Sequence, residues 1–122
     1  MKTASQIILN EFSKANLDPQ ENFRKIIQFV KDGKAFFMRK ADTILLVKMI
    51  DSNVGELHIF TEDSPIMIAR AVKQFWQDLV KLGIHTVYGK AENEQIVKLM
   101  KIVRAPIVDS DKEQYTWKAN IC

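Results

Sequence analysis

Residues 4–16 and 19–32 each carry apolar side chains at helical spacing, with polar side chains between them. This spacing predicts two amphipathic helices, because positions three and four apart lie on the same helix face. The second helix also has clear boundary signals. Asp18 is an N-cap carboxylate, Pro19 suits the first helical position and Gly33 offers a C-terminal stop.

The pattern changes to that of strands between residues 34 and 61. Three runs rich in apolar residues, 35–39, 43–50 and 56–60, are separated by short polar breaks. Short polar connections are typical of antiparallel meanders, so we expect three consecutive antiparallel strands. The middle run is almost continuously apolar, which predicts that both of its faces are covered.

A long amphipathic helix follows the third predicted strand. Ser64 can act as its N-cap with Pro65 at the first helical position, and Gly83 ends it. The next apolar run, 84–88, predicts a strand. A strand, helix and strand in this order favour a right-handed crossover onto a parallel neighbour.

The remaining residues predict one more helix and a final pair of strands. Residues 92–104 have helical spacing, and Pro106 prevents the helix from continuing. Residues 105–109 and 114–121 then indicate a closing hairpin. The whole order predicts an α+β fold with a mixed sheet: an antiparallel meander, a parallel crossover pair and a C-terminal hairpin, with helices on both faces.

Composition supports a single domain over residues 1–122. The chain is 47% hydrophobic and 27% charged, which is ordinary for a globular protein. No apolar run is long enough to cross a membrane and the first residues lack a secretory pattern, so we expect a cytoplasmic protein without a membrane partner.

Charge and chemistry-bearing residues argue against several classes of function. The 18 basic and 15 acidic residues are interspersed along the chain, which argues against a nucleic-acid-binding surface. Cys122 is the only cysteine, so we expect neither a disulfide framework nor a cysteine metal motif. His58 and His85 have no ligand-like spacing around them, and we expect no metal site.

Residues 87–100 read Val-Tyr-Gly-Lys-Ala-Glu-Asn-Glu-Gln-Ile-Val-Lys-Leu-Met. The spacing of Asn93, Ile96 and Leu99 in this segment is similar to that of the asparagine-led helix in the GNAT superfamily of N-acetyltransferases. The predicted order of elements also resembles the GNAT fold over nearly the whole chain. The resemblance implies a GNAT-like sheet, acetyl-CoA as cofactor, an amine substrate, and Asn93 beside the pantetheine arm of the cofactor.

The segment that enters the long predicted helix differs from that family. GNAT enzymes use a glycine-rich loop here, because bare backbone amides must approach the cofactor's pyrophosphate closely. In this chain the segment is Thr-Glu-Asp-Ser-Pro-Ile-Met at 61–67, which has no glycine and two carboxylates. The resemblance places the cofactor phosphates at the amides after Ser64, those of Ile66 and Met67. We therefore expect a degenerate cofactor site.

Two residues are candidates for catalysis. Glu56 and His58 alternate on the strand where the superfamily often places a general base, so either could activate an amine. Alternating polar residues also mark the wetter face of an ordinary strand. Met100 stands where the family often has a tyrosine acid, and a thioether has no proton to give. Whether the chain is an enzyme stays open.

The size of the chain, residues 87–100 and the predicted hairpin also resemble the small GNAT-like proteins of tailed phages, which include internal virion proteins. That resemblance implies a non-catalytic virion or host-interaction protein that uses the fold as a scaffold for a protein partner. An acyl-CoA-dependent N-acetyltransferase and such a scaffold are the two functions that the sequence supports best, and a small nucleic-acid-binding module is a third, less favoured interpretation. The sequence does not give the oligomeric state.

Overall fold

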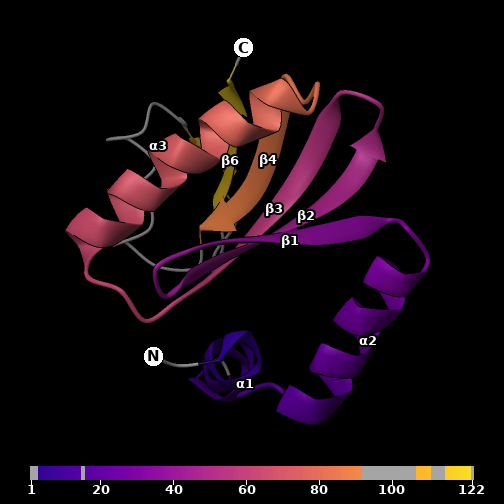
Figure 1. The fold of residues 1–122 in the computed structure, drawn as a ribbon, viewed down its shortest axis with the longest axis vertical. Coiled ribbons are helices and arrows are strands. Elements are labelled where there is room, and N and C mark those ends of the chain that lie inside the picture. Colours follow the sequence, from indigo (N-terminus) through magenta and orange to yellow (C-terminus); the bar gives the residue numbers. More distant parts are fainter. Residues whose placement is uncertain (1–2, 15, 92–106, 111–114, 122) are drawn as a thin grey trace.

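The structure is a computed structural model, and it describes residues 3–14, 16–91, 107–110 and 115–121. Figure 1 shows a mixed sheet with one helix on one face and two helices near the other. The elements are α1 (Ala4–Lys14), α2 (Pro19–Lys31), β1 (Ala35–Lys40), β2 (Thr43–Asp51), β3 (Val54–Thr61), α3 (Pro65–Lys81), β4 (Thr86–Ala91), β5 (Ile107–Ser110) and β6 (Tyr115–Asn120).

The six described strands form one sheet in the order β1-β2-β3-β4-β6-β5. β1, β2 and β3 are antiparallel neighbours, and β3 pairs with β4 in parallel. β6 pairs antiparallel with both β4 and β5. The predicted meander, parallel pair and closing hairpin are confirmed, whereas the position of β6 between β4 and β5 was not predicted. The helix predicted over 92–104 lies outside the described residues.

The helix ends follow the signals in the sequence. Asp18 Oδ1 accepts a hydrogen bond of 3.1 Å from the backbone amide of Glu21, as an N-cap should. Gly33 and Gly83, which end α2 and α3, have positive φ angles of 74° and 87°. Glycine adopts this left-handed conformation without the steric cost that other residues incur, so both helices end where a glycine is available.

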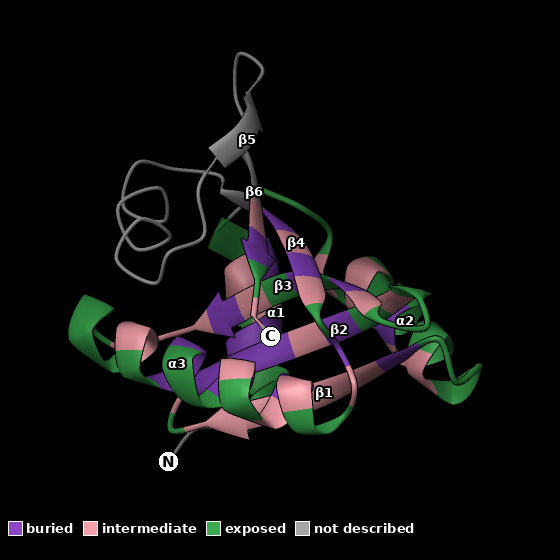
Figure 2. Ribbon diagram, turned by 90° about the horizontal axis from the view of Figure 1, so that it is seen from above, coloured by how far each residue is buried: buried purple, intermediate pink, exposed green. Residues whose placement is uncertain are grey.

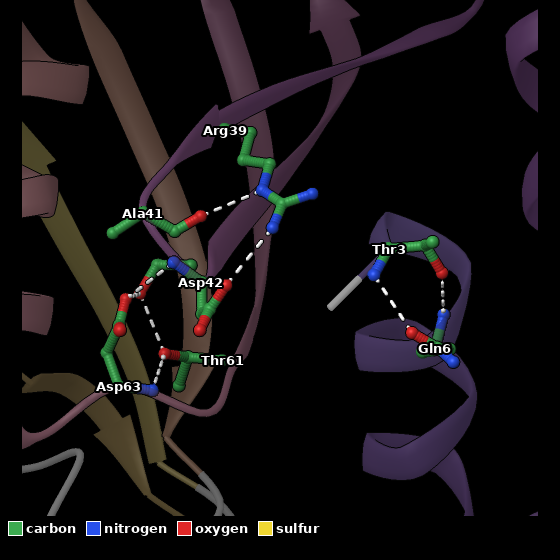
Figure 3. Close-up of polar contacts among 8 residues, drawn as sticks. Thr3, Gln6, Arg39, Ala41, Asp42, Thr61 and Asp63 are labelled. Carbon is green, nitrogen blue, oxygen red and sulfur yellow. Dashed lines mark hydrogen bonds and ion pairs between the residues drawn. The ribbon is translucent and has the colours of Figure 1, made fainter. Parts of the chain in front are cut away.

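α1 begins with a reciprocal cap that helical spacing alone does not reveal. Thr3 Oγ1 accepts from the Gln6 amide at 3.2 Å, and Gln6 Oε1 accepts from the Thr3 amide at 3.0 Å (Figure 3). This is the capping-box arrangement, which satisfies two backbone donors at the start of a helix. α1 therefore begins at Ala4 because Thr3 and Gln6 cap it.

A hydrophobic core lies on each face of the sheet (Figure 2). On one face, Phe75 and Leu79 of α3 pack in a cluster with strand residues Leu45, Val47, Leu57, Val87 and Ala119. On the other, Ile7, Ile8 and Phe12 of α1 and Ile26 of α2 pack against Ile44 and Phe60. Helices on both faces, as predicted, therefore enclose the first part of the sheet.

The prediction that both faces of the middle strand are covered holds only for its first half. Thr43, Ile44 and Leu45 are buried, whereas Lys48 and Ile50 are exposed. The reason is the extent of the helical layer: the cluster formed with α1 and α2 includes Ile44 and, at its edge, Leu46, but reaches no further along β2. The second half of β2 thus presents one face to solvent.

β4 lies two positions later than the run of apolar residues predicts. Ile84 belongs to the α3 core, but its amide donates to Leu79 O at 3.0 Å, and the His85 amide donates to Asn53 O at 2.9 Å. These bonds belong to the turn before the strand. β4 then continues to Ala91 because β6 pairs with it as far as Tyr115.

Candidate functional site

β3 and β4 separate near the middle of the sheet. Their parallel register runs from Val54 with Thr86 to Leu57 with Gly89, and no further pair joins them among the described residues. β3 nevertheless continues through His58–Thr61, still paired with β2, and β4 continues to Ala91, still paired with β6. Beyond Leu57, the facing edges of β3 and β4 therefore have no strand partner in the part of the chain that the structure describes. We call this region the strand opening.

A cross-strand row of polar residues leads up to the strand opening. Lys48 of β2 is in register with Glu56 of β3, Glu56 with Tyr88 of β4, and Tyr88 with Lys118 of β6. Their chain neighbours lie in the α3 core, and side chains alternate along a strand, so all four lie on the opposite face. Lys48 and Glu56 are exposed, and Tyr88 and Lys118 are half-buried. We call these four residues the polar row.

The two predicted catalytic residues share this face but have different surroundings. The His58 ring stacks on Phe60 with centroids 4.5 Å apart, and the Phe12 ring lies 6.5 Å away. His58 thus packs along the edge of the α1 core. Glu56 is exposed, and no hydrogen bond or ion pair engages its side chain within the described part of the chain. Both side chains are exposed, and Glu56 is the one of the two that no contact engages in the described part of the chain.

The N-terminus of α3 offers few free amides. Ser64 is the N-cap, as predicted, and its Oγ lies 3.5 Å from the Met67 amide. The Ile68 amide donates to Ser64 O at 2.9 Å, and Pro65 has no amide hydrogen. Among the described amides of the first turn, this leaves that of Ile66 without an acceptor. The Ile66 and Met67 side chains are 68% and 39% exposed, so they lie at the surface.

The loop before α3 is tied to the turn between β1 and β2 (Figure 3). Asp63 Oδ2 accepts from the Asp42 amide at 3.0 Å and from Thr43 Oγ1 at 2.7 Å. Thr61 Oγ1 lies 2.7 Å from Thr43 Oγ1 and accepts from the Asp63 amide at 3.1 Å. In the sequence, Asp63 stands out only as one of the two carboxylates of a segment that lacks glycine. The carboxylate in fact holds two distant loops together.

The other loop carboxylate and a neighbouring arginine extend this network. Glu62 Oε1 accepts from Asn10 Nδ2 of α1 at 2.9 Å. Arg39 donates to Ala41 O at 2.8 Å and forms an ion pair of 3.1 Å with Asp42. The loop therefore contacts α1 as well as the β1–β2 turn, and its conformation is set by bonds within the protein.

These residues do not fit a diphosphate. A phosphate site at a helix N-terminus needs several free amides, and here one is free and two acidic residues precede it. The helix dipole contributes only about 0.3–1 kcal/mol to anion binding, which a nearby negative charge can cancel. Of the predicted cofactor residues, Ser64, Ile66 and Met67 lie together at this helix end, whereas Asn93 lies outside the described residues.

Other kinds of site are less prominent in the described residues. No group of three or more His, Cys, Asp and Glu side chains there could hold a metal ion. None of the described helices is both long enough and apolar enough to span a bilayer. An apolar pocket of about 240 Å³ lies between α1, α2 and β1, but none of the predicted site residues lines it; its lining includes Ile8, Phe23, Ile27, Phe37 and Met38.

The architecture matches solved structures of acetyltransferases. No family model matches the sequence, and no curated protein is significantly similar to it. An aminoglycoside 6'-acetyltransferase of type Ii superposes with a TM-score of 0.73 at 12% identity, over 97% of this chain and 90% of that one.

Two further structures, from Campylobacter jejuni and Vibrio fischeri, support the same assignment. The N-acetyltransferase PseH of Campylobacter jejuni, solved with acetyl coenzyme A, gives a TM-score of 0.64 at 15% identity, over 98% of this chain and 92% of that one. The ribosomal-protein-S5-alanine acetyltransferase of Vibrio fischeri gives 0.64 at 11% identity, over 95% and 87%. The chain therefore has the α+β fold of the GNAT N-acetyltransferases. At these identities the likeness establishes the fold.

Proposed function

We propose that this protein is a divergent GNAT-fold N-acyltransferase that transfers an acyl group from an acyl-CoA thioester, such as acetyl-CoA, to an amine. The observation that supports this most is the strand opening, which begins just beyond Leu57, the residue after Glu56. The exposed Glu56 carboxylate lies beside it and has no partner in the described structure. A reactive thioester and a proton acceptor could meet there.

The strand opening suits the pantetheine arm of the donor. Pantetheine is an extended chain with two amide groups, and a strand edge without a partner presents backbone donors and acceptors to such a chain, as in β-augmentation. The α3 end, with one free amide, contributes little to the diphosphate. Donor recognition in this proposal therefore depends on the arm and hardly on the phosphates.

Glu56 supplies the protein's part of the chemistry. Aliphatic amines are mostly protonated near neutral pH, so an acceptor needs to lose a proton before it can attack. The Glu56 carboxylate accepts that proton, and the neutral amine then attacks. A bound thioester would supply the acyl group: its carbon–sulfur bond would break as the carbon–nitrogen bond forms, and the leaving thiolate would take up the second proton that the nitrogen loses.

A calorimetric comparison of two donors tests this proposal. We expect acetyl-pantetheine and acetyl-CoA to bind with dissociation constants within about threefold of each other, a difference below 1 kcal/mol. If acetyl-CoA bound more than about tenfold tighter, a difference of 1.4 kcal/mol, the reasoning about α3 would be wrong. If neither thioester bound at millimolar concentration, the acyltransferase itself would be excluded.

A variant at Glu56 tests the proposed chemistry. Glu56→Gln should reduce acyl transfer by at least about a hundredfold, because general base catalysis contributes that much or more. Glu21→Gln is a matched control, since Glu21 is also exposed and lies on α2, away from the polar row. Equal loss of activity in both variants would contradict a specific role for Glu56.

We propose as a second candidate a non-catalytic scaffold, of the kind found in phage virion or host-interaction proteins. Two observations favour it: the loop before α3 is committed to internal bonds, and Ile66 and Met67 are exposed at the helix end where a partner could cover them. This candidate predicts that neither thioester binds. It also predicts that the gene lies among genes for tail or ejection proteins, and metabolic neighbours would count against it.

A further inference from the structure

The polar row has an unusual balance of charge for a surface that would bind an amine. It contains two lysines and a single carboxylate. Neither Lys48 nor Lys118 forms an ion pair with any of residues 3–14, 16–91, 107–110 and 115–121. Two cations that have no carboxylate partner among the described residues therefore lie on either side of Glu56, the only acidic residue in the row.

The two lysines are held differently. Lys48 Nζ lies 4.7 Å from the centre of the Phe29 ring of α2. Lys48 is therefore on the β2 side of Glu56, whereas the strand opening is on the β4 side. Lys118 Nζ lies 5.7 Å from the centre of the Tyr88 ring, and Tyr88 is the residue of β4 in register with Glu56. A cation over an aromatic face keeps its charge available to a ligand on its other side. Lys118 therefore places a cation on the β4 side of Glu56.

The spacing of the strands sets the shape of a ligand that could use both groups. Neighbouring strands lie about 4.8 Å apart, and Glu56 and Lys118 stand two strands apart with the Lys118 side chain leaning back over Tyr88. A molecule that spans from Glu56 to this ammonium group needs opposite charges only a few bonds apart.

We propose that the acceptor bound at the polar row is a small amine that also carries a phosphate or carboxylate group, with its nitrogen at Glu56 and its anionic group at Lys118. This inference rests on the proposed function, because it names the acceptor of that reaction. Electrostatic complementarity is the reason: opposite charges on ligand and surface meet, whereas a polyamine would place its further cations against Lys48 and Lys118. The next described carboxylate along the chain, Glu62 in the loop after β3, accepts a hydrogen bond from Asn10 of α1.

The proposal is tested by titrating ¹⁵N-labelled protein, without any thioester, and following the amide signals of Glu56, Tyr88 and Lys118 by NMR. Phosphoethanolamine and β-alanine probe the phosphate and carboxylate forms of the ligand, and ethanolamine and spermidine lack the anionic group. We expect saturable shifts with at least one of the first two, and affinity at least about threefold weaker for ethanolamine and spermidine, which is the scale of one exposed or half-exposed ion pair. Whichever anionic probe binds tighter identifies the anionic group.

Variants decide whether Lys118 is responsible. Lys118→Gln should weaken binding about threefold to tenfold, and Lys118→Arg should keep most of it, because arginine also pairs with phosphate and carboxylate. Lys73→Gln on the exposed side of α3 changes the net charge equally and should leave binding unchanged. Absence of saturable shifts, equal binding of spermidine, or equal effects of Lys118→Gln and Lys73→Gln would overturn the proposal.

The same titration separates this inference from the acyltransferase proposal. Acceptor binding is measured without a donor, and donor binding is measured without an acceptor. If the protein binds phosphoethanolamine but no thioester, the acceptor site is supported and the acyltransferase activity is excluded. If the protein binds acetyl-pantetheine but neither anionic amine, the acyltransferase proposal stands and the proposed acceptor is refuted.

Discussion

Replacing Thr43 with valine is expected to lower the free energy of unfolding by about 2 kcal/mol. Thr43 is 0% exposed, and its Oγ1 lies 2.7 Å from both Thr61 Oγ1 and Asp63 Oδ2. Valine keeps the shape but cannot form these bonds. A neutral hydrogen bond contributes about 1 kcal/mol and one to a charged group about 1.5–3 kcal/mol, while the added methyl group returns roughly 0.8 kcal/mol.

Two control variants separate the hydroxyl group from packing. Thr43→Ser keeps the hydroxyl and removes one buried methyl group, which should lower the free energy of unfolding by about 1 kcal/mol. Thr86→Val removes a hydroxyl that lies 3.3 Å from Asn120 Oδ1 at a half-exposed position, and should change the free energy by less than about 0.5 kcal/mol. The expected order of stability is therefore Thr86→Val, then Thr43→Ser, then Thr43→Val.

Urea unfolding followed by far-ultraviolet circular dichroism measures these differences, provided that the slope of the free energy of unfolding against urea concentration is the same in all variants. Amide hydrogen exchange adds a local readout, since the Asp42 and Asp63 amides should exchange faster in Thr43→Val. A Thr43→Val protein as stable as the parent, or more stable than Thr43→Ser, would refute the reasoning. Asp63 would then be held well enough by the Asp42 amide alone.

Three further variants test other parts of the structure. Ala41 has a positive φ of 52° in the β1–β2 turn, which costs a residue with a side chain roughly 1 kcal/mol. Ala41→Gly should therefore raise the melting temperature, and a lower melting temperature would contradict this reasoning. A Cβ atom on buried Gly55 would lie 3.2 Å from Val47 Cγ1, so Gly55→Ala should lower the free energy of unfolding by about 1 kcal/mol. In a double-mutant cycle, Val47→Ala should relieve part of that loss, whereas simple additivity would argue against the contact. Glu56→Gln should leave the free energy of unfolding within about 0.5 kcal/mol of the parent, and a larger loss would mean that Glu56 is structural.

The elements that were predictable from the sequence are those specified by neighbouring residues. Asp18 and Ser64 cap α2 and α3 through side chains that reach amides three residues away, and Gly33 supplies the left-handed residue that ends α2. The antiparallel meander is local in the same sense, because β1, β2 and β3 are joined by short turns. Each such signal lies within a few residues of the structure that it specifies.

The features that could not be predicted depend on residues distant in the chain. The position of β6 beside β4 pairs Thr86 with Asn120, and no local pattern records that pairing. The polar row gathers one residue from each of four strands, so Lys118 could not be assigned to the candidate site from its neighbours in sequence. Glu56 and His58 could be identified as candidates on one strand face, but not distinguished, because the stacking of His58 on Phe60 is visible only in three dimensions.

The segment before α3 is where sequence and structure lead to different explanations of the same residues. A glycine loop would leave its amides free for a diphosphate, whereas Asp63 binds the β1–β2 turn through Asp42 and Thr43. Freeing this loop for phosphate would therefore break bonds that stabilise the fold, so a cofactor cradle cannot be restored here by adding glycines alone. Because the strand opening requires none of these loop residues, a donor could still be recognised through its pantetheine arm. Whether the protein binds the diphosphate and whether it binds the thioester arm are thus separate questions, and the comparison of acetyl-pantetheine with acetyl-CoA answers them separately.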